Sequence, residues 1–112
     1  DTSVLTAISN DYGFTHVFSR QIEAIGNEGD ALISISTSGQ SANIVKAAQI
    51  AKDKNIKIIS LIGSKQSKLH DLSDIVLTTK VTNTARIQEI HILYGHILCS
   101  LVEESIFKNK KI

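Results

Sequence analysis

The stretch ALISISTSGQSANIVKAAQIAKDKNIKIISLI, residues 31 to 62, has two short apolar runs with a segment of helical spacing between them. It opens with the apolar run 31–35, which is typical of a short buried strand. Between residues 41 and 54 the apolar positions recur at helical spacing, at Ile44, Ala47, Ala48 and Ala51. The run 57–62 is again short and apolar. The stretch therefore predicts a strand, a helix and a second strand.

Two helices are predicted before this stretch. Asp1 or Ser3 can cap a first helix that ends at Tyr12-Gly13, and a second helix ends before Gly26. The apolar positions that support them are Val4, Leu5 and Ile8 in the first, and Val17, Phe18, Ile22 and Ile25 in the second.

Three further elements are predicted after it. We expect a short helix at 67–72, a strand at 74–79 and a long helix from Thr84 to about Lys108. The long helix has a wide apolar stripe that could pack against a sheet or a partner helix.

Helices that alternate with short apolar strands predict an α/β fold with a parallel sheet covered by helices on both faces. Three strands make a thin sheet, and right-handed connections would leave one edge open for strands that this chain does not supply. The chain also begins at Asp1 without an initiator methionine. From both features we expect a piece of a longer protein.

The length and composition of the chain indicate one globular domain. The chain has 112 residues, 42% apolar and 21% charged, with a formal charge of +1, so no bulk charge attracts nucleic acid or a membrane. The basic segment 108–111 is interpreted as a solvated tail. No signal sequence opens the chain and no run of about 18 apolar residues predicts a membrane span. The single cysteine, Cys99, is predicted to be a buried small hydrophobic residue in a cytoplasmic protein.

A cluster of hydroxyl side chains follows the first strand predicted in the stretch 31–62. Ser36, Thr37, Ser38 and Ser41 lie where a parallel strand leads into a helix, which is where such folds bind ligands. Together with free N–H groups at the helix start, they could cradle a phosphate. The alternative is that Ser41 is only a helix cap and the other hydroxyls only form turns.

Other polar positions are weaker candidates. The loop 63–68 follows a strand but lacks the glycine spacing of a phosphate-binding loop, so we expect a plain surface loop. His16 and His70 stand alone and are interpreted as ordinary polar residues.

The long helix contains a polar group among branched apolar residues, namely Gln88, Glu89, His91 and His96. Histidine is well suited to move protons near neutral pH. Eight residues separate Gln88 from His96, about 12 Å of helix rise, so both could meet one ligand only if their side chains lean toward each other. The alternative is that these residues form the wet side of an amphipathic helix.

Three motifs in this order, DTSVLTAISNDYG (1–13), ISTSGQSAN (35–43) and TARIQEIHILYGHI (84–97), resemble the sugar isomerase (SIS) domain of bacterial phosphoheptose isomerases. The resemblance covers almost the whole chain. It implies a flavodoxin-like three-layer αβα fold, with residues 1–112 as the C-terminal portion of the SIS domain. The family's N-terminal part, which includes a glycine-rich loop and a helix with a histidine and the proposed catalytic glutamate, has no counterpart here.

The resemblance also implies site residues. Ser36, Thr37, Ser38 and Ser41 would hold the phosphate of a sugar phosphate. The binding of the substrate would further involve Asn10 and Asp11. The family's zinc ion would be bound by Gln88 and His96, with His96 also a catalytic acid or base. In a metal-free alternative, Gln88 only hydrogen-bonds the sugar.

The activity implied by the resemblance is conversion of sedoheptulose 7-phosphate to D-glycero-D-manno-heptose 7-phosphate through an enediol. It would serve lipopolysaccharide or capsule synthesis, in a homotetramer, with no nucleic acid or membrane partner. This piece alone is expected to be inactive. Two alternatives stay open: a regulatory module that binds a phosphosugar, and a relative that binds a replication initiator protein.

Overall fold

The computed structural model describes residues 1–108. Its elements alternate between helices and strands as the sequence predicts. They are α1 (Thr2–Tyr12), the 3-10 turn η1 (Phe14–His16), α2 (Ser19–Ile25), β1 (Ala31–Ser36), α3 (Ala42–Asp53), β2 (Lys57–Ile62), α4 (Lys68–Leu72), β3 (Ile75–Leu77) and α5 (Thr84–Phe107).

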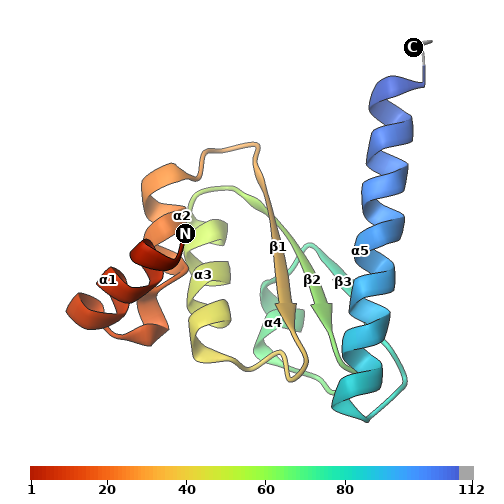
Figure 1. The fold of residues 1–112 in the computed structure, drawn as a ribbon, viewed down its shortest axis with the longest axis horizontal. Helices are drawn as coiled ribbons and strands as arrows, with labels where there is room; N and C mark the ends of the chain where they lie inside the picture. Colours follow the sequence, from red (N-terminus) through yellow and green to blue (C-terminus); the bar gives the residue numbers. More distant parts are fainter. Residues whose placement is uncertain (109–112) are drawn as a thin grey trace.

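The three strands form one parallel sheet in the order β1-β2-β3. Ala31 pairs with Lys57 and Ser36 with Ile62, so β1 and β2 end level with each other. Figure 1 shows α1, α2 and α3 on one side of the sheet and α5 on the other, which gives three layers. This confirms the predicted α/β fold.

The core lies between the sheet and the helices α3 and α4. Its buried members are Val45, Ala48, Ala51, Ile56, Ile58, Ile62 and Leu69. The small alanines of α3 let that helix lie close to the strands, while the larger isoleucines fill the space between. The predicted helical face of residues 41–54 is therefore the face that packs on the sheet.

Strand β1 lies at the edge of the sheet, and one of its two faces is exposed, contrary to expectation. The sequence pattern predicted a strand covered on both faces, but Ile33 is 52% and Ile35 55% exposed. In contrast, the alternate residues Ser34 and Ser36 are buried on the side of α3. The open edge agrees with a sheet that lacks further strands, as the count of three strands had indicated.

Two predicted boundaries also shift. The second helix begins only at Ser19, after a 3-10 turn that holds His16, and the third strand shortens to Ile75–Leu77. Asp74 leaves that strand to serve as an anchor, since its carboxylate accepts hydrogen bonds from Lys57 Nζ at 2.8 Å and from the N–H of Ile58 at 2.8 Å. The Lys57 ammonium and then this N–H lower the pKa of Asp74.

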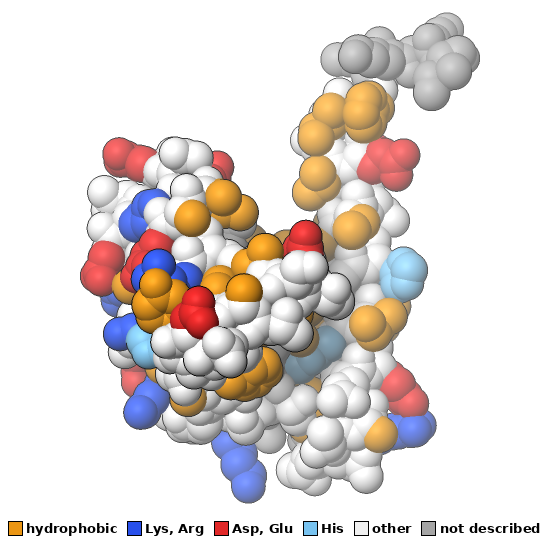
Figure 2. Space-filling view, turned by 60° about the vertical axis from the view of Figure 1, so that its left-hand side comes forward, with side chains coloured by type: hydrophobic (Ala, Val, Ile, Leu, Met, Phe, Trp, Pro, Cys, Tyr) orange, Lys and Arg blue, Asp and Glu red, His pale blue; other side chains and the backbone are white. Residues whose placement is uncertain are grey.

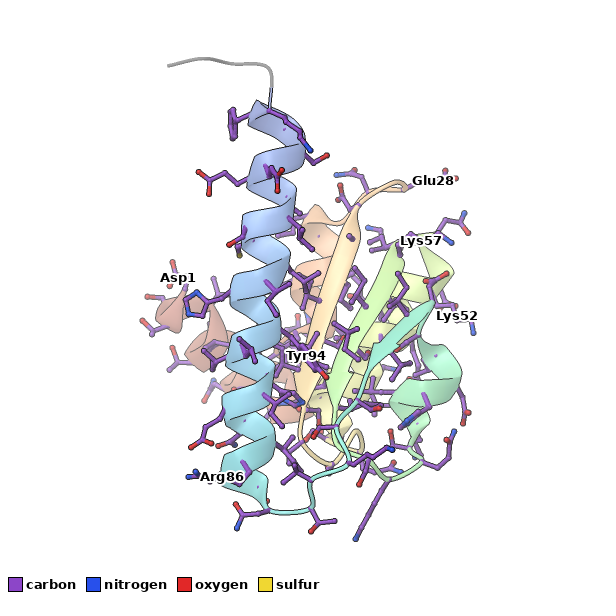
Figure 3. All side chains as sticks on the ribbon, turned by 90° about the vertical axis from the view of Figure 1, so that its right-hand side faces the viewer. Asp1, Glu28, Lys52, Lys57, Arg86 and Tyr94 are labelled. Carbon is purple, nitrogen blue, oxygen red and sulfur yellow. The ribbon has the colours of Figure 1, made fainter. Side chains whose placement is uncertain are left out.

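Helix α5 is attached to the sheet near its first half only. Its buried residues are Ile87 and His91, and the hydroxyl of Tyr94 donates a hydrogen bond to the carbonyl oxygen of Thr78 at 2.9 Å. Figure 3 shows Tyr94 pointing from α5 toward the sheet.

The second half of α5 extends beyond the sheet with hydrophobic side chains in view (Figure 2). Large exposed residues there include Ile97, Leu101, Val102 and Ile106. The prediction that Cys99 is buried was wrong, because this part of the helix has no covering layer within residues 1–108 and Cys99 is exposed. By length and composition alone α5 could cross a membrane, a test that core helices of other proteins also pass. Of the basic segment 108–111, residues 109–111 lie outside the described residues.

Two glycines bring the loops after β1 and β2 together. Gly39 has φ +64°, and a Cβ built on it would lie 2.6 Å from Cβ of Ser67. A Cβ on Gly63 would lie 2.6 Å from the carbonyl oxygen of Thr37, which accepts the N–H of Gly63 at 3.0 Å. Each glycine therefore allows a close approach that a side chain would block.

We predict that Tyr94→Phe lowers the free energy of unfolding by about 0.5–1.5 kcal/mol, because it removes the hydrogen bond to Thr78 and keeps the ring. Tyr12→Phe is the matched control, since within residues 1–108 the Tyr12 hydroxyl has no hydrogen-bond partner and the ring contact with Arg20 survives. Denaturant unfolding measures both. Equal effects of the two variants would show that the Tyr94 hydroxyl does not hold α5.

We also predict that Gly39→Ala destabilises the chain more than Gly29→Ala. Both glycines have positive φ, but an added Cβ at Gly29 meets nothing within 4 Å. The control should therefore cost only the backbone strain, about 1–2 kcal/mol, and Gly39→Ala about 1–3 kcal/mol more for the overlap with Ser67. Denaturant midpoints give the comparison. Equal losses would mean that the loop yields without cost.

Candidate functional site

The candidate site lies where β1 and β2 end and α3 begins. Figure 1 shows the loop that joins β1 to α3 at the same edge of the sheet as the first turn of α5. The loops that follow parallel strands all lie at the carboxyl ends of the strands. The N-terminus of α3 lies at the same end of the sheet and carries a partial positive charge. Within residues 1–108 the N–H groups of Ser41, Ala42 and Asn43 have no hydrogen-bond acceptor.

Hydrogen bonds fix the shape of the loop from Thr37 to Ser41. The buried Ser36 hydroxyl donates to Ser41 Oγ at 3.2 Å and accepts the N–H of Gly39 at 3.2 Å. The hydroxyl of Ser38 accepts the N–H of Gln40 at 3.2 Å. Ser36 and Ser38 therefore shape the turn, as the alternative interpretation of the hydroxyls proposed.

Ser41 does not act as the helix cap that the alternative interpretation expected. It occupies the N-cap position of α3, but its side chain makes no capping hydrogen bond. Its oxygen accepts from Ser36 instead. A hydroxyl that accepts one hydrogen bond keeps its own proton to donate. Ser41 and Ser38 can therefore both donate to an anion in front of α3.

A hollow of about 660 Å³ opens in front of this loop. Its walls come from three segments: Thr37, Ser38, Gln40 and Ser41 before α3; Gly63, Ser64, Lys65 and Gln66 after β2; and Thr82, Thr84 and Ile87 before and within α5. Ser36 lies behind the wall. Of the predicted cradle, Thr37, Ser38 and Ser41 thus face the hollow, and Ser36 supports them.

The loop 63–66 was expected to be a plain surface loop, but it forms one wall of this hollow. The glycine-spacing test missed it because the loop is positioned by its neighbour, through the bond between Gly63 and Thr37, rather than by a motif of its own. The signal that could have found it is register: two parallel strands of six residues that end level place their following loops side by side.

Asn10 and Asp11 lie away from the hollow. They are exposed near the end of α1, where Asn10 Nδ2 donates to Asp11 Oδ1 at 2.9 Å. Asp11 lines a separate groove between α1 and α2. Within residues 1–108 the structure does not bring this pair to the hydroxyl cradle.

Gln88 and His96 also lie outside the hollow. Both are exposed on α5, and His96 lines a second, apolar hollow beside Ile33 and Ile35 of the open strand. The same hollow is lined by His91, which is 3% exposed and has no hydrogen-bond partner at either ring nitrogen within residues 1–108. A buried imidazole without a partner is costly, so this face of α5 is incomplete in the described part of the chain.

Of the two lone histidines, His70 is a satisfied polar residue. Its Nδ1 accepts the N–H of Ser67 at 3.1 Å and lies 2.9 Å from Ser67 Oγ, which closes the start of α4. His16 is half-buried in the 3-10 turn and outside both hollows.

Zinc can be tested against the side chains present. An imidazole and an amide oxygen make half of a tetrahedral set of four ligands, so Gln88 and His96 fit zinc only if other ligands join them. Among residues 1–108, no three side chains of His, Cys, Asp or Glu come together in a way that could hold a metal ion.

The curated proteins that are similar to this chain include several phosphoheptose isomerases. The chain is 54% identical over 110 residues to the phosphoheptose isomerase of Aneurinibacillus thermoaerophilus, a match that covers 98% of this chain and 56% of the relative. The chain therefore spans about half the length of the curated relatives it matches.

Solved structures agree in fold. The phosphoheptose isomerase GmhA of Neisseria gonorrhoeae superposes with a TM-score of 0.88 at 47% identity, over 91% of this chain and 58% of that one. The Vibrio vulnificus NanR protein complexed with ManNAc-6P superposes with a TM-score of 0.66 at 25% identity, over 81% of this chain and 36% of that one.

The SIS domain model matches residues 1–63, which is more than half of the chain and includes α1, β1, the hydroxyl loop, α3 and β2. The chain belongs to the SIS domain family.

Proposed function

We propose that this chain is part of a sugar-phosphate isomerase that converts sedoheptulose 7-phosphate to D-glycero-D-manno-heptose 7-phosphate. The observation that carries the proposal is the hydroxyl loop at the start of α3, whose donors face a hollow, in a chain 54% identical to a phosphoheptose isomerase. The product would enter lipopolysaccharide or capsule synthesis in the cytoplasm.

The loop would bind the phosphate. Ser38, Ser41 and Thr37 can donate hydroxyl protons, and the free N–H groups at the start of α3 add further donors. Near pH 7 a phosphate monoester is mostly the dianion, whose oxygens accept hydrogen bonds, so a cradle made of donors matches it. Ser36 would keep Ser41 in place through their hydrogen bond.

The isomerisation moves two protons and no heavy atoms. A base removes a proton from C1 of the ketose, and an acid protonates the carbonyl oxygen at C2 to give the enediol. The enediol then takes a proton at C2 and loses one from the oxygen at C1, which becomes the aldehyde. His96 is suited to the proton transfers at oxygen because imidazole exchanges protons near neutral pH. The base at carbon would come from outside this chain.

Gln88 and His96 would bind zinc together with ligands from outside residues 1–108. A bound zinc ion would polarise the carbonyl and hydroxyl oxygens of the sugar. Without metal, Gln88 would donate a hydrogen bond to the sugar.

The same incompleteness supports a larger assembly. The open edge of β1 and the exposed apolar residues of α5 are surfaces that isolated proteins rarely leave uncovered, and the buried His91 beside them has no hydrogen-bond partner within residues 1–108. We propose that the remainder of the protein and a homotetramer cover them, that Asn10 and Asp11 approach the substrate only there, and that residues 1–112 alone do not turn over substrate.

A second candidate is a module that binds a phosphosugar without converting it. The likeness to the NanR protein complexed with ManNAc-6P favours it, because such a module would need only the phosphate cradle. No contact within residues 1–108 favours the third alternative, binding to a replication initiator protein.

We predict that His96→Ala lowers kcat of the complete protein about 10²–10⁴-fold, the usual contribution of a general acid or base. NMR detection of the aldose formed from sedoheptulose 7-phosphate measures the rate. His16→Ala is the control, because His16 lies outside both hollows, and it should leave kcat unchanged.

Turnover by the His96→Ala variant at the rate of the control would remove His96 from the mechanism. Binding of sedoheptulose 7-phosphate by the complete protein without any aldose would favour the second candidate. Turnover by residues 1–112 alone would contradict the proposed division of the site.

A further inference from the structure

The hydroxyl loop is electrically neutral, although its proposed ligand is not. A sugar phosphate carries a charge between −1 and −2 near pH 7, since the second pKa of a phosphate monoester is about 6. Hydroxyl and N–H donors can replace the water around such an anion, but they supply no full opposite charge. An anion that leaves water without a cation nearby loses much of its solvation energy. A cation beside the loop would therefore stabilise the bound phosphate.

Lys65 is the only charged residue among the described residues that line the hollow. It lies in the loop that follows β2, beside the hydroxyl loop. We propose that the ammonium group of Lys65 binds the phosphate of the substrate and completes the hydroxyl cradle. This inference rests on the proposed function and names the residue that sets affinity for the phosphorylated form of the sugar.

Register places the two walls together. Ser36 and Ile62 are paired at the ends of β1 and β2, so the two following loops start level. The bond from the N–H of Gly63 to the carbonyl oxygen of Thr37, at 3.0 Å, holds them side by side one residue later. Lys65 follows Gly63 by two residues, and its flexible four-carbon stem can carry the ammonium group across the hollow.

Lys65 is also uncommitted. Among residues 1–108 it forms no ion pair and no side-chain hydrogen bond. Other lysines near the sheet are engaged: Lys57 pairs with Asp74 at 2.8 Å, and Lys54 donates to the carbonyl oxygens of Ile22 and Glu23 at 3.3 and 2.8 Å. Lys65 is exposed and lines a hollow that several hydroxyl groups also line, so its ammonium group is available for an anion.

The chain supplies a matched control three residues away. Lys68 is exposed at the start of α4 and does not line the hollow. Lys65→Ala and Lys68→Ala remove the same charge from the same segment. A general effect of net charge would act on both variants, and a contact with the phosphate only on the first.

The test uses the complete protein and compares wild type, Lys65→Ala, Lys65→Arg and Lys68→Ala. Lys65→Ala should raise KM for sedoheptulose 7-phosphate and the inhibition constant of inorganic phosphate about ten- to a hundredfold, as expected for loss of one charged hydrogen bond, with kcat nearly unchanged. Lys65→Arg should restore most of the affinity, and Lys68→Ala should match wild type. Added salt should weaken phosphate inhibition of wild type more than that of Lys65→Ala.

Two readouts separate a phosphate contact from a structural role. Free sedoheptulose has no phosphate, so its conversion, assayed at high concentration, should be equal in wild type and Lys65→Ala. Thermal unfolding should be equal too, because Lys65 holds no other residue in place. Equal KM and phosphate inhibition in Lys65→Ala and Lys68→Ala would overturn the inference, as would an equal loss with free sedoheptulose.

Failure of the proposed function would look different. If wild type binds sedoheptulose 7-phosphate by calorimetry but yields no aldose, the isomerase proposal fails. The dissociation constants of the four proteins then still decide the role of Lys65: weaker binding in Lys65→Ala alone supports it, and equal binding overturns it.

Discussion

The hydrogen bond from the N–H of Gly63 to the carbonyl oxygen of Thr37 joins the two loops on which the candidate site depends. It forms where β1 and β2 end level, and it is possible only because position 63 has no Cβ. This hydrogen bond helps to fix the position of the hydroxyl loop in front of α3 and the position of the loop that carries Lys65. Ile87 of α5 closes the hollow from the third side and lies within reach of Gly63.

The site is divided between parts that this chain completes and parts that it does not. The shape of the hydroxyl loop is complete in this chain, since Ser36 and Gly39 fix the loop through contacts within residues 1–108. The face of α5 that carries His91 and His96 is not complete within residues 1–108, because it borders the exposed residues Ile33 and Ile35 of β1 and leaves His91 without a hydrogen-bond partner. The proposed binding of the phosphate and the proposed chemistry at the carbonyl thus involve different surfaces of this chain.

The fold was largely predictable, because it follows from local periodicity: the run 57–62 became β2 without change, and the helix from Thr84 began at the predicted residue. The site was less so. The place of Ser41 after a strand predicted a ligand-binding role. The sequence did not show that its hydroxyl makes no capping hydrogen bond and accepts one from Ser36, five residues earlier. The place of Lys65 at the hollow was not predicted, because it comes from strand register, which no motif encodes. Cys99 was misplaced because an apolar sequence does not reveal whether its covering layer is in the same chain.

The proposed function requires the hydroxyl loop before α3 to bind the phosphate of a sugar phosphate. The most direct measurement is a crystal structure of the complete protein with sedoheptulose 7-phosphate bound. We expect the phosphate oxygens at hydrogen-bond distance, about 2.6–3.2 Å, from the hydroxyls of Ser38 and Ser41 and from the N–H groups at the start of α3. A phosphate bound elsewhere, or a sugar in the hollow with its phosphate in solvent, would contradict the account.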